Sequence, residues 1–391
     1  MTVMPDPPVN CLPVNVVMIS AYFPAHGGGV EAVAEKLVEY ASQSGHATLI
    51  WFASDADAAP TLRAGSTAVG IRAYNQLERA FGVPWPIWTP AAIRELWIAI
   101  GRADIVHIQD TLYPGTLIGG MISLLKDKPL MVTQHIGLVP YRNPIFRGLM
   151  IAANHTIARF LLQRAAQVAF VSESVNRYFD AICRWQRKPA LVPNGVDNSL
   201  YRPATVAERE AARTSLRPGG QRPICLFVGR FVEKKGLLLL RQLAADLPNV
   251  DWIFAGRGPL DPRAWRLGNV VVFNDRLKES LRELYWTADL LVLPSMGEGF
   301  PLVVQEAMAC GIQAIVSQEV ADGFPLAAEV ICVEKLGEGS RARWGNRIEE
   351  ILQSHRMPEA LAGFAAKHWS WSAAGGYYSD LYSRLRNEHP G

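Results

Sequence analysis

The sequence predicts an α/β fold with two doubly wound, Rossmann-like domains that face each other across an interdomain cleft. Short runs of β-branched and aliphatic residues alternate with amphipathic helical patterns, as expected for parallel sheets covered by helices on both faces. This alternation stops at a polar stretch around residues 200–222, which ends in Pro and Gly, and then starts again. We interpret that stretch as a connector between the domains.

The expected strands are short and largely apolar in both halves of the chain. In the first half they cover residues 14–20, 47–54, 103–109, 129–135 and 167–172, and in the second half residues 224–230, 250–256, 269–273, 288–295 and 313–317. A helical pattern at 30–45 follows the first strand, with apolar residues three and four positions apart. Since ligands bind beyond the carboxyl ends of strands in such sheets, the functional site is expected in the loops that follow them.

The composition excludes several classes of protein. The chain has 391 residues, 49% of them apolar, and its 39 Lys and Arg nearly balance its 36 Asp and Glu. Such a chain can bury large cores, so intrinsic disorder is excluded, and the small net charge predicts no nucleic-acid partner. Five scattered cysteines without a C-x-x-C pattern argue against a disulfide framework or a zinc site and fit a reducing cytoplasm.

Membrane-spanning and secretory segments are not expected either. No Lys or Arg precedes Lys36, so the N-terminus lacks the basic region of a secretory signal. The longer apolar stretches are too short to cross a bilayer or are interrupted, for example by His155 and Arg159.

A glycine triplet follows the first expected strand, in the sequence AHGGG that ends with Gly28 and Gly29. Glycines let a ligand approach the backbone closely, and the N-terminus of the following helix attracts anions. The pattern is not G-x-G-x-x-G, which weakens a dinucleotide-binding interpretation. A simple tight turn is the alternative.

Two cations follow the first strand of the second half, in GRFVEKKG. Arg230 ends that strand and Lys235 comes five residues later. A guanidinium and an ammonium at the carboxyl end of a strand suit a diphosphate, although ordinary surface charge gives the same pattern.

The segment PSMGEGFPLVVQEAMACG carries two carboxylates around the start of an expected helix. Pro301 suits the first turn of that helix, so Glu298 lies before it and Glu306 lies on it, about 8 Å further along the axis. Each could accept hydrogen bonds from sugar hydroxyls, one set on a hexose and the other on a ribose. The apolar neighbours of Glu306 indicate that it is not fully exposed.

Taken together, these motifs resemble the retaining glycosyltransferases of glycosyltransferase family 4, which have the GT-B fold. The matching pieces are HGGGVE, VTQHIG, VSES, VPNGVD, VGRFVEKKG, FAGRGPL and PSMGEGFPLVVQEAMACG, and they extend over most of the chain. The E-x7-E signature beside the Arg and Lys pair is the specific part. The resemblance implies a GT-B architecture, with an acceptor-side domain at 1–200, a nucleotide-sugar-binding domain at 201–368 and a C-terminal helix at 369–391 that packs back on the first domain.

The resemblance also implies roles for particular residues. It assigns His135 and Glu298 to the transferred sugar, as the catalytic pair. The donor-binding residues that it implies are Gly28, Gly29, Arg230, Lys235, Arg276, Phe300, Pro301, Leu302 and Glu306. Within this set Arg230 and Lys235 hold the diphosphate, Glu306 holds the ribose, and the region of Arg276 lies near the base. Asn194, in PNGVD, is expected to shape the hinge.

The implied activity is transfer of a hexose, with retention of configuration, from a nucleoside-diphosphate sugar, most simply UDP- or GDP-linked. The acceptor is a glycan or a lipid-linked sugar, as in bacterial surface polysaccharide biosynthesis. No metal and no cofactor are expected, because cations and N–H dipoles can stabilise the leaving diphosphate. A non-catalytic nucleotide-sugar-binding protein and a nucleotide-sugar epimerase on the same fold are the alternatives.

Three further patterns were weighed. The sequence Asp55-Ala-Asp57 spells D-x-D, a metal-binding motif of another glycosyltransferase fold, but a polar turn is the preferred interpretation. Gln313 stands where the family commonly has proline. Clustered Trp and Arg residues predict either peripheral contact with the inner face of the membrane or core helices with basic ends. These residues are Trp85, Trp88, Arg94, Trp97, Arg142, Arg147, Arg159 and Arg164.

Overall fold

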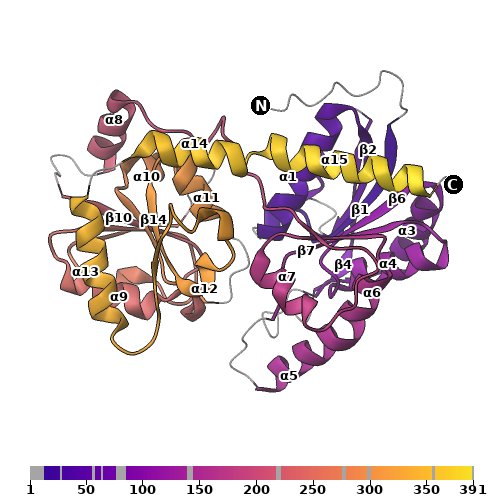
Figure 1. Ribbon diagram of the computed structural model, residues 1–391, viewed down its shortest axis with the longest axis horizontal. Helices are drawn as coiled ribbons and strands as arrows, with labels where there is room; N and C mark the ends of the chain where they lie inside the picture. Colours follow the sequence, from indigo (N-terminus) through magenta and orange to yellow (C-terminus); the bar gives the residue numbers. More distant parts are fainter. Residues whose placement is uncertain are drawn as a thin grey trace.

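The computed structural model describes residues 13–26, 29–54, 58–62, 65–75, 85–138, 144–216, 222–274, 279–296, 301–354 and 357–389. Two parallel sheets, each flanked by helices on both faces, form the two lobes seen in Figure 1. The predicted fold class of two Rossmann-like α/β domains is therefore confirmed.

The first lobe is built on a seven-stranded parallel sheet with the order β3-β2-β1-β6-β7-β8-β9. Its strands are β1 (Val14–Tyr22), β2 (Ala47–Ser54), β3 (Thr67–Ile71), β6 (Ile105–Gln109), β7 (Leu130–Gln134), β8 (Gln167–Phe170) and β9 (Ala190–Leu191). A separate antiparallel pair joins β4 (Ala73–Tyr74) to β5 (Ile87–Trp88). The central strand β1 is buried at eight of its nine positions, as its unbroken apolar sequence predicts.

The second lobe is built on a six-stranded parallel sheet with the order β12-β11-β10-β13-β14-β15. Its strands are β10 (Ile224–Val228), β11 (Asp251–Ala255), β12 (Val270–Phe273), β13 (Leu290–Leu293), β14 (Gln313–Ser317) and β15 (Cys332–Glu334). In both sheets the first strand lies in the interior. The next two strands of the sheet are added on one side of it, and all later strands are added on the other side. The strand order reverses between β1 and β6 and between β10 and β13, and the loops at such switch points bind ligands.

Helices cover both faces of each sheet. In the first lobe they are η1 (Pro24–His26), α1 (Gly29–Ser44), α3 (Pro90–Arg102), α4 (Pro114–Leu125), α5 (Pro144–Ala153), the π-helical turn η3 (Asn154–Ala158), α6 (Arg159–Arg164) and α7 (Glu173–Asp180). In the second lobe they are α8 (Val206–Leu216), η4 (Glu233–Lys235), α9 (Leu237–Asp246), η5 (Pro262–Trp265), α10 (Glu279–Thr287), α11 (Leu302–Ala309), α12 (Gln318–Ala321), η6 (Pro325–Ala327), α13 (Ser340–Gln353) and α14 (Pro358–His368).

The last helix, α15 (Trp371–Glu388), returns to the first lobe, so that α14 and α15 run along one side of both lobes in Figure 1. Tyr378 and Tyr382 of α15 are buried in the first lobe, whereas Trp369 packs in the core of the second. The chain also passes from the first lobe to the second near Val196. The two connections lie side by side, since the Val196 N–H donates to the carbonyl of Trp369. The expected return of a C-terminal helix to the first domain agrees with these positions, while the domain bounds 1–200, 201–368 and 369–391 stay a prediction.

The polar stretch at 200–222 is more than a connector. It contains α8, and Arg209 and Arg213 of that helix both pair with the buried Asp289 at the start of β13. The prediction missed this helix because its polar face is satisfied by a carboxylate far away in the sequence. β3, β9 and β15 were also missed, and all three lie at or near a sheet edge, where the apolar signal is weak.

Within the described ranges, no helix is both long and apolar enough to cross a membrane.

Candidate functional site

The loop after β10 places the two predicted cations at the carboxyl end of the second sheet. Arg230 follows the strand directly and is exposed, and Lys235 ends the short helix η4 and is half-buried. The Lys235 side chain folds back over the strand end, since a Cβ built on Gly229 would lie 3.8 Å from its Nζ atom. The ammonium therefore stays beside the sheet.

Close backbone contacts fix this loop against the loop after β13. Gly236 has a φ of 75°, and a Cβ there would collide with the carbonyl of Pro294. The N–H of Met296 donates to the carbonyl of Lys234 over 2.7 Å. The two segments predicted to bind the donor are thus neighbours, as expected from loops that flank a switch point.

Helix α11 begins beside these loops and carries Glu306. Pro301 is its N-cap residue, one position before the predicted first turn, and it provides no side-chain acceptor to the first N–H groups. Those N–H groups can therefore serve an anion. Leu302 opens the helix and packs against the core of the first lobe, and the Gln305 amide donates to the carbonyl of Asn194 over 2.7 Å. α11 thus lies between the two lobes, next to the predicted hinge residue.

Glu306 is partly buried and held by tyrosines. The Tyr285 hydroxyl donates to Oε2 of Glu306 over 2.7 Å. Desolvation raises the pKa of the Glu306 carboxyl, although hydrogen bonds from Tyr285 and Tyr201 oppose this shift. The prediction that Glu306 is not fully exposed is confirmed, and its second carboxylate oxygen can accept from a ligand hydroxyl.

Several predicted residues lie outside the described ranges. They are Gly28, Arg276, Glu298 and Phe300, together with Asp55 and Asp57 of the D-x-D sequence. Their assigned roles stay predictions.

His135 follows β7 at the carboxyl edge of the first sheet, and Gly29 begins α1 after β1, which is separated from β7 by β6. His135 is 7% exposed, and its Nε2 lies 2.8 Å from Oε1 of Gln109. Burial lowers the pKa of the ring to about 3, so the imidazole is neutral. Because Oε1 can only accept, Nε2 carries the proton and Nδ1 keeps a lone pair.

A buried hydrogen-bond network extends from His135 to the C-terminal helix. Gln109 Nε2 lies 3.2 Å from Nε2 of His107, which also contacts the Thr133 hydroxyl at 2.8 Å. Nδ1 of His107 lies 2.7 Å from the hydroxyl of Tyr382 on α15. Burial, with a smaller effect from His135, lowers the pKa of His107 to about 3. His107 is the middle residue of β6, and the network makes it a support of His135.

Asp110 was missed by the sequence analysis. It follows β6 with a φ of 64°, unusual for a residue with a side chain, and its Oδ1 accepts the N–H groups of His135 and Ile136 at 2.9 and 3.2 Å. Its Oδ2 is buried without a hydrogen-bond partner in the described part of the chain. Burial raises the pKa of the Asp110 carboxyl to about 7, and the charge of Glu31 adds to this effect. Its position after a buried strand was the signal that could have identified it.

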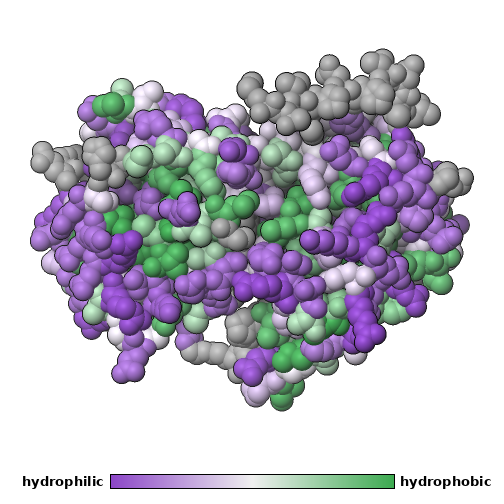
Figure 2. Space-filling model, in the orientation of Figure 1, coloured by the Kyte–Doolittle hydropathy of each residue, from purple (hydrophilic) through white to green (hydrophobic). Residues whose placement is uncertain are grey.

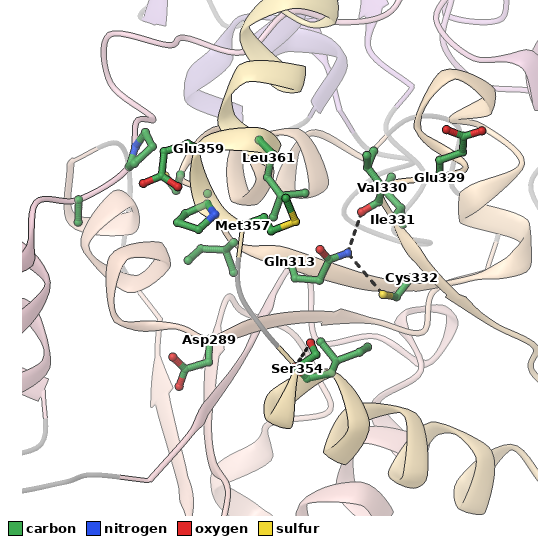
Figure 3. A pocket seen from close by; sticks show the side chains of 18 of the residues that line it. Asp289, Gln313, Glu329, Val330, Ile331, Cys332, Ser354, Met357, Glu359 and Leu361 are labelled. Atoms are coloured by element: carbon green, nitrogen blue, oxygen red, sulfur yellow. Dashed lines mark hydrogen bonds between the residues drawn. The ribbon is translucent and has the colours of Figure 1, made fainter.

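A cavity of about 690 Å³ lies at the opposite, amino end of the second sheet. Asp289, Gln313 and Cys332 line it from the starts of β13, β14 and β15 (Figure 3). The Gln313 amide donates to the carbonyl of Val330 over 2.8 Å and approaches Cys332 Sγ at 3.5 Å, which a proline could not do. This departure from the family pattern is therefore structural and lies away from the donor loops. No group of His, Cys, Asp or Glu in the described ranges has an arrangement that could hold a metal ion.

Comparison with known sequences also indicates a glycosyltransferase. The family model described as Glycosyltransferase Family 4 matches residues 27–200, and the one described as Glycosyl transferases group 1 matches residues 208–367. A D-inositol 3-phosphate glycosyltransferase of Mycolicibacterium smegmatis is 32% identical over 220 residues, 51% of this chain and 49% of the relative. Sulfoquinovosyl transferase SQD2 of Arabidopsis thaliana is 28% identical over 244 residues, 61% of this chain and 46% of the relative. The matches span about half the length of these relatives.

Solved structures share the fold over nearly the whole chain. Sucrose-phosphate synthase from Thermosynechococcus elongatus has a TM-score of 0.76 and 18% identity, covering 96% of this chain and 100% of that one. Anabaena Alr3699/HepE in complex with UDP-glucose has a TM-score of 0.70 and 15% identity, covering 95% and 100%. At these identities the likeness shows the fold alone. The two family models account for both lobes, and the chain belongs to the family 4-like glycosyltransferases of the GT-B fold.

Proposed function

We propose that this chain is a retaining hexosyltransferase that moves a hexose from a nucleoside-diphosphate sugar to a glycan or lipid-linked acceptor in bacterial surface polysaccharide biosynthesis. One observation carries the proposal: Lys235, beside Gly229, is joined by close backbone contacts to the loop that leads into α11 and Glu306. A diphosphate at this place would meet an ammonium, the guanidinium of Arg230 and open helix N–H groups. These groups stabilise the charge that develops on the leaving diphosphate.

The two lobes contribute different parts of the reaction. The second lobe holds the nucleotide, with Glu306 accepting hydrogen bonds from the ribose. The first lobe presents neutral His135, whose Nδ1 lone pair can accept a hydrogen bond from a sugar hydroxyl. The proposal includes no metal ion and no cofactor, since the chain's own cations act on the leaving group. The UDP and UDP-glucose complexes of Anabaena Alr3699/HepE support a UDP-sugar as the first donor to try.

The test is donor binding followed by transfer. UDP-, GDP- and ADP-sugars are screened by thermal shift, because a ligand that binds only the folded state raises its apparent stability. Calorimetry with the best donor then compares wild type with Arg230→Ala and Glu306→Ala. Both variants should lose at least tenfold in affinity, whereas the exposed Arg241→Ala on α9 should bind as wild type does. Normal affinity in both site variants would refute this donor site.

Product analysis separates the proposed activity from its alternatives. A transferase forms a glycosylated acceptor, with retained anomeric configuration visible by NMR. An epimerase converts the sugar without an acceptor, and a binding protein gives no product.

A further inference from the structure

One long helix of the first lobe, described from Pro144 to Arg164, has buried side chains in only the second half of its length. α5, η3 and α6 run without a break from Pro144 to Arg164. α6 buries Leu161 and Leu162 in the core, so the core-helix interpretation is right for this half. α5 has no buried residue, although half of its ten residues are large and apolar.

Three of the five large apolar side chains of α5 are exposed to solvent. Ile145 is 76% exposed and Leu149 is 64% exposed, and their spacing of four places both on one face of the helix. Phe146 is 38% exposed, and further along the same helix Ile157 and Phe160 are about 40% exposed. Figure 2 shows hydrophobic residues in green at the lower tip of the molecule, where Figure 1 draws α5. A contiguous apolar surface of this kind marks an interaction site.

The charge around this helix identifies the partner. No Asp or Glu occurs anywhere in residues 128–172, whereas five Lys and Arg do. A stretch of this length would carry about four acidic residues at the chain's average. Arg147 and Arg164 are exposed on the helix, and the Arg164 guanidinium lies 5.1 Å from the ring centre of Phe160. Apolar side chains on a stretch of chain that carries cations and no anions of its own fit an anionic lipid surface, where chains insert and phosphates pair with arginine.

The helix is also tied to the site. Asn154, in the π-helical turn between α5 and α6, donates to the carbonyl of Gly137 over 3.3 Å and to the hydroxyl of Tyr178 over 3.2 Å. Gly137 lies two residues after His135. A surface that receives the tip of α5 is therefore held close to the acceptor side of the cleft.

We propose that α5, through Ile145, Leu149 and Arg147, docks this enzyme on an anionic phospholipid bilayer, at the inner face of the cytoplasmic membrane. The inference rests on the proposed function in one respect only: if the acceptor is lipid-linked, docking on the membrane explains how that acceptor reaches the cleft. The Trp part of the sequence-based membrane prediction is not needed. Trp88 is 4% exposed and its Nε1–H donates to Ser54, so it is a core residue.

Vesicle co-sedimentation of the full chain, without donor or acceptor, tests the docking. We expect binding to phosphatidylcholine vesicles that contain phosphatidylglycerol, weakening as salt is added, and at least tenfold weaker binding to phosphatidylcholine alone. The double variant Ile145→Ser, Leu149→Ser and the charge reversal Arg147→Glu should each lose at least tenfold. Leu238→Ser on α9, where the leucine is 67% exposed, is the matched control and should bind normally.

Three results would overturn the docking proposal. They are absence of binding to anionic vesicles, an equal loss in Leu238→Ser, and a dimer-to-monomer change of the α5 variants in sedimentation velocity, which would assign the face to a second copy. Donor calorimetry on the α5 variants keeps the two proposals apart. It should match wild type, and vesicle binding can hold even if the donor assignment fails.

Discussion

The two sheets have a similar strand order, but the predicted site residues at their carboxyl ends differ in charge. In the first lobe, His107, Gln109 and His135 form an enclosed, neutral network. In the second lobe, Arg230 and Lys235 keep contact with solvent on a loop supported by glycines. Burying a cation is costly, and Arg230 and Lys235 are accordingly not buried, whereas the neutral groups of the first network can be enclosed. In the proposed reaction the second lobe would supply charge and the first lobe would supply geometry.

The largest effect is expected from removing charge in the second lobe. Lys235→Ala should reduce kcat/KM for transfer by about 10²- to 10³-fold, as loss of one preorganised donor to a developing negative charge typically does. Steady-state kinetics measure this, with circular dichroism to confirm folding. Arg241→Ala serves as the matched loss of a cation, and a comparable defect there would mean that net charge alone matters.

A buried charge of the second lobe should act on stability without touching the donor. The Asp289 side chain is 1% exposed and pairs with Arg209 and Arg213, both at 2.5 Å. Asp289→Ala should lower the free energy of unfolding by about 3 kcal/mol, because it leaves two guanidinium groups and the Ile224 N–H without their acceptor. Denaturant titration measures the change.

Asp246 provides the control for that experiment, since it pairs with Arg341 on the surface. Asp246→Ala should leave unfolding close to wild type. If Asp289→Ala also weakened donor binding more than its stability loss explains, the claim that Asp289, at the amino end of this sheet, acts on stability alone would be wrong.

A smaller effect is expected from the neutral network of the first lobe. Gln109→Met removes the acceptor that fixes the tautomer of His135, so kcat should fall about tenfold while the KM for donor changes little. Gln109→Glu places a carboxylate beside the same ring and should raise the pKa of His135 from about 3, moving the acid limb of the pH–rate profile upward. An unchanged profile in Gln109→Glu would show that His135 does not depend on this contact.

The smallest effect is a pH dependence of stability. His107 and His135 have their pKa values lowered from 6.5 to about 3, so they bind protons in the unfolded chain and not in the native one between these values. Asp110, with a pKa raised from 3.8 to about 7, does the opposite. Counting these three groups, the unfolded state binds one more proton than the native state between about pH 4 and 6, and their contribution to stability should fall by about 1.4 kcal/mol per pH unit on acidification.

Asp110→Asn removes the opposing group, so the slope of stability against pH should double in that window. Urea titrations at several pH values test this. A slope that stays the same in the variant would mean that Asp110 is ionised in the native protein.

Much of this site follows from local sequence. The strand ends and the helix start of α11 were predicted to within two residues, because buried strands leave a short apolar run and Pro301 marks a helix start. The cations at 230 and 235 and the carboxylate at 306 were identified by their spacing from those ends. Asp110 was missed: its position after a buried strand marked it as a candidate, but only the structure shows that its carboxylate accepts from the backbone of His135.

Sequence by itself determined the alternation of strands and helices, and with it the edge of each sheet where chemistry can occur. Only the tertiary structure decided which side chains meet there. His107 and Tyr382 are 275 positions apart. α5 and α6 both combine large apolar residues with arginine, yet α6 buries Leu161 and Leu162 and α5 buries none of its residues. The physical reason is that periodicity records the local tendency to be buried, whereas partners are set by how distant elements dock.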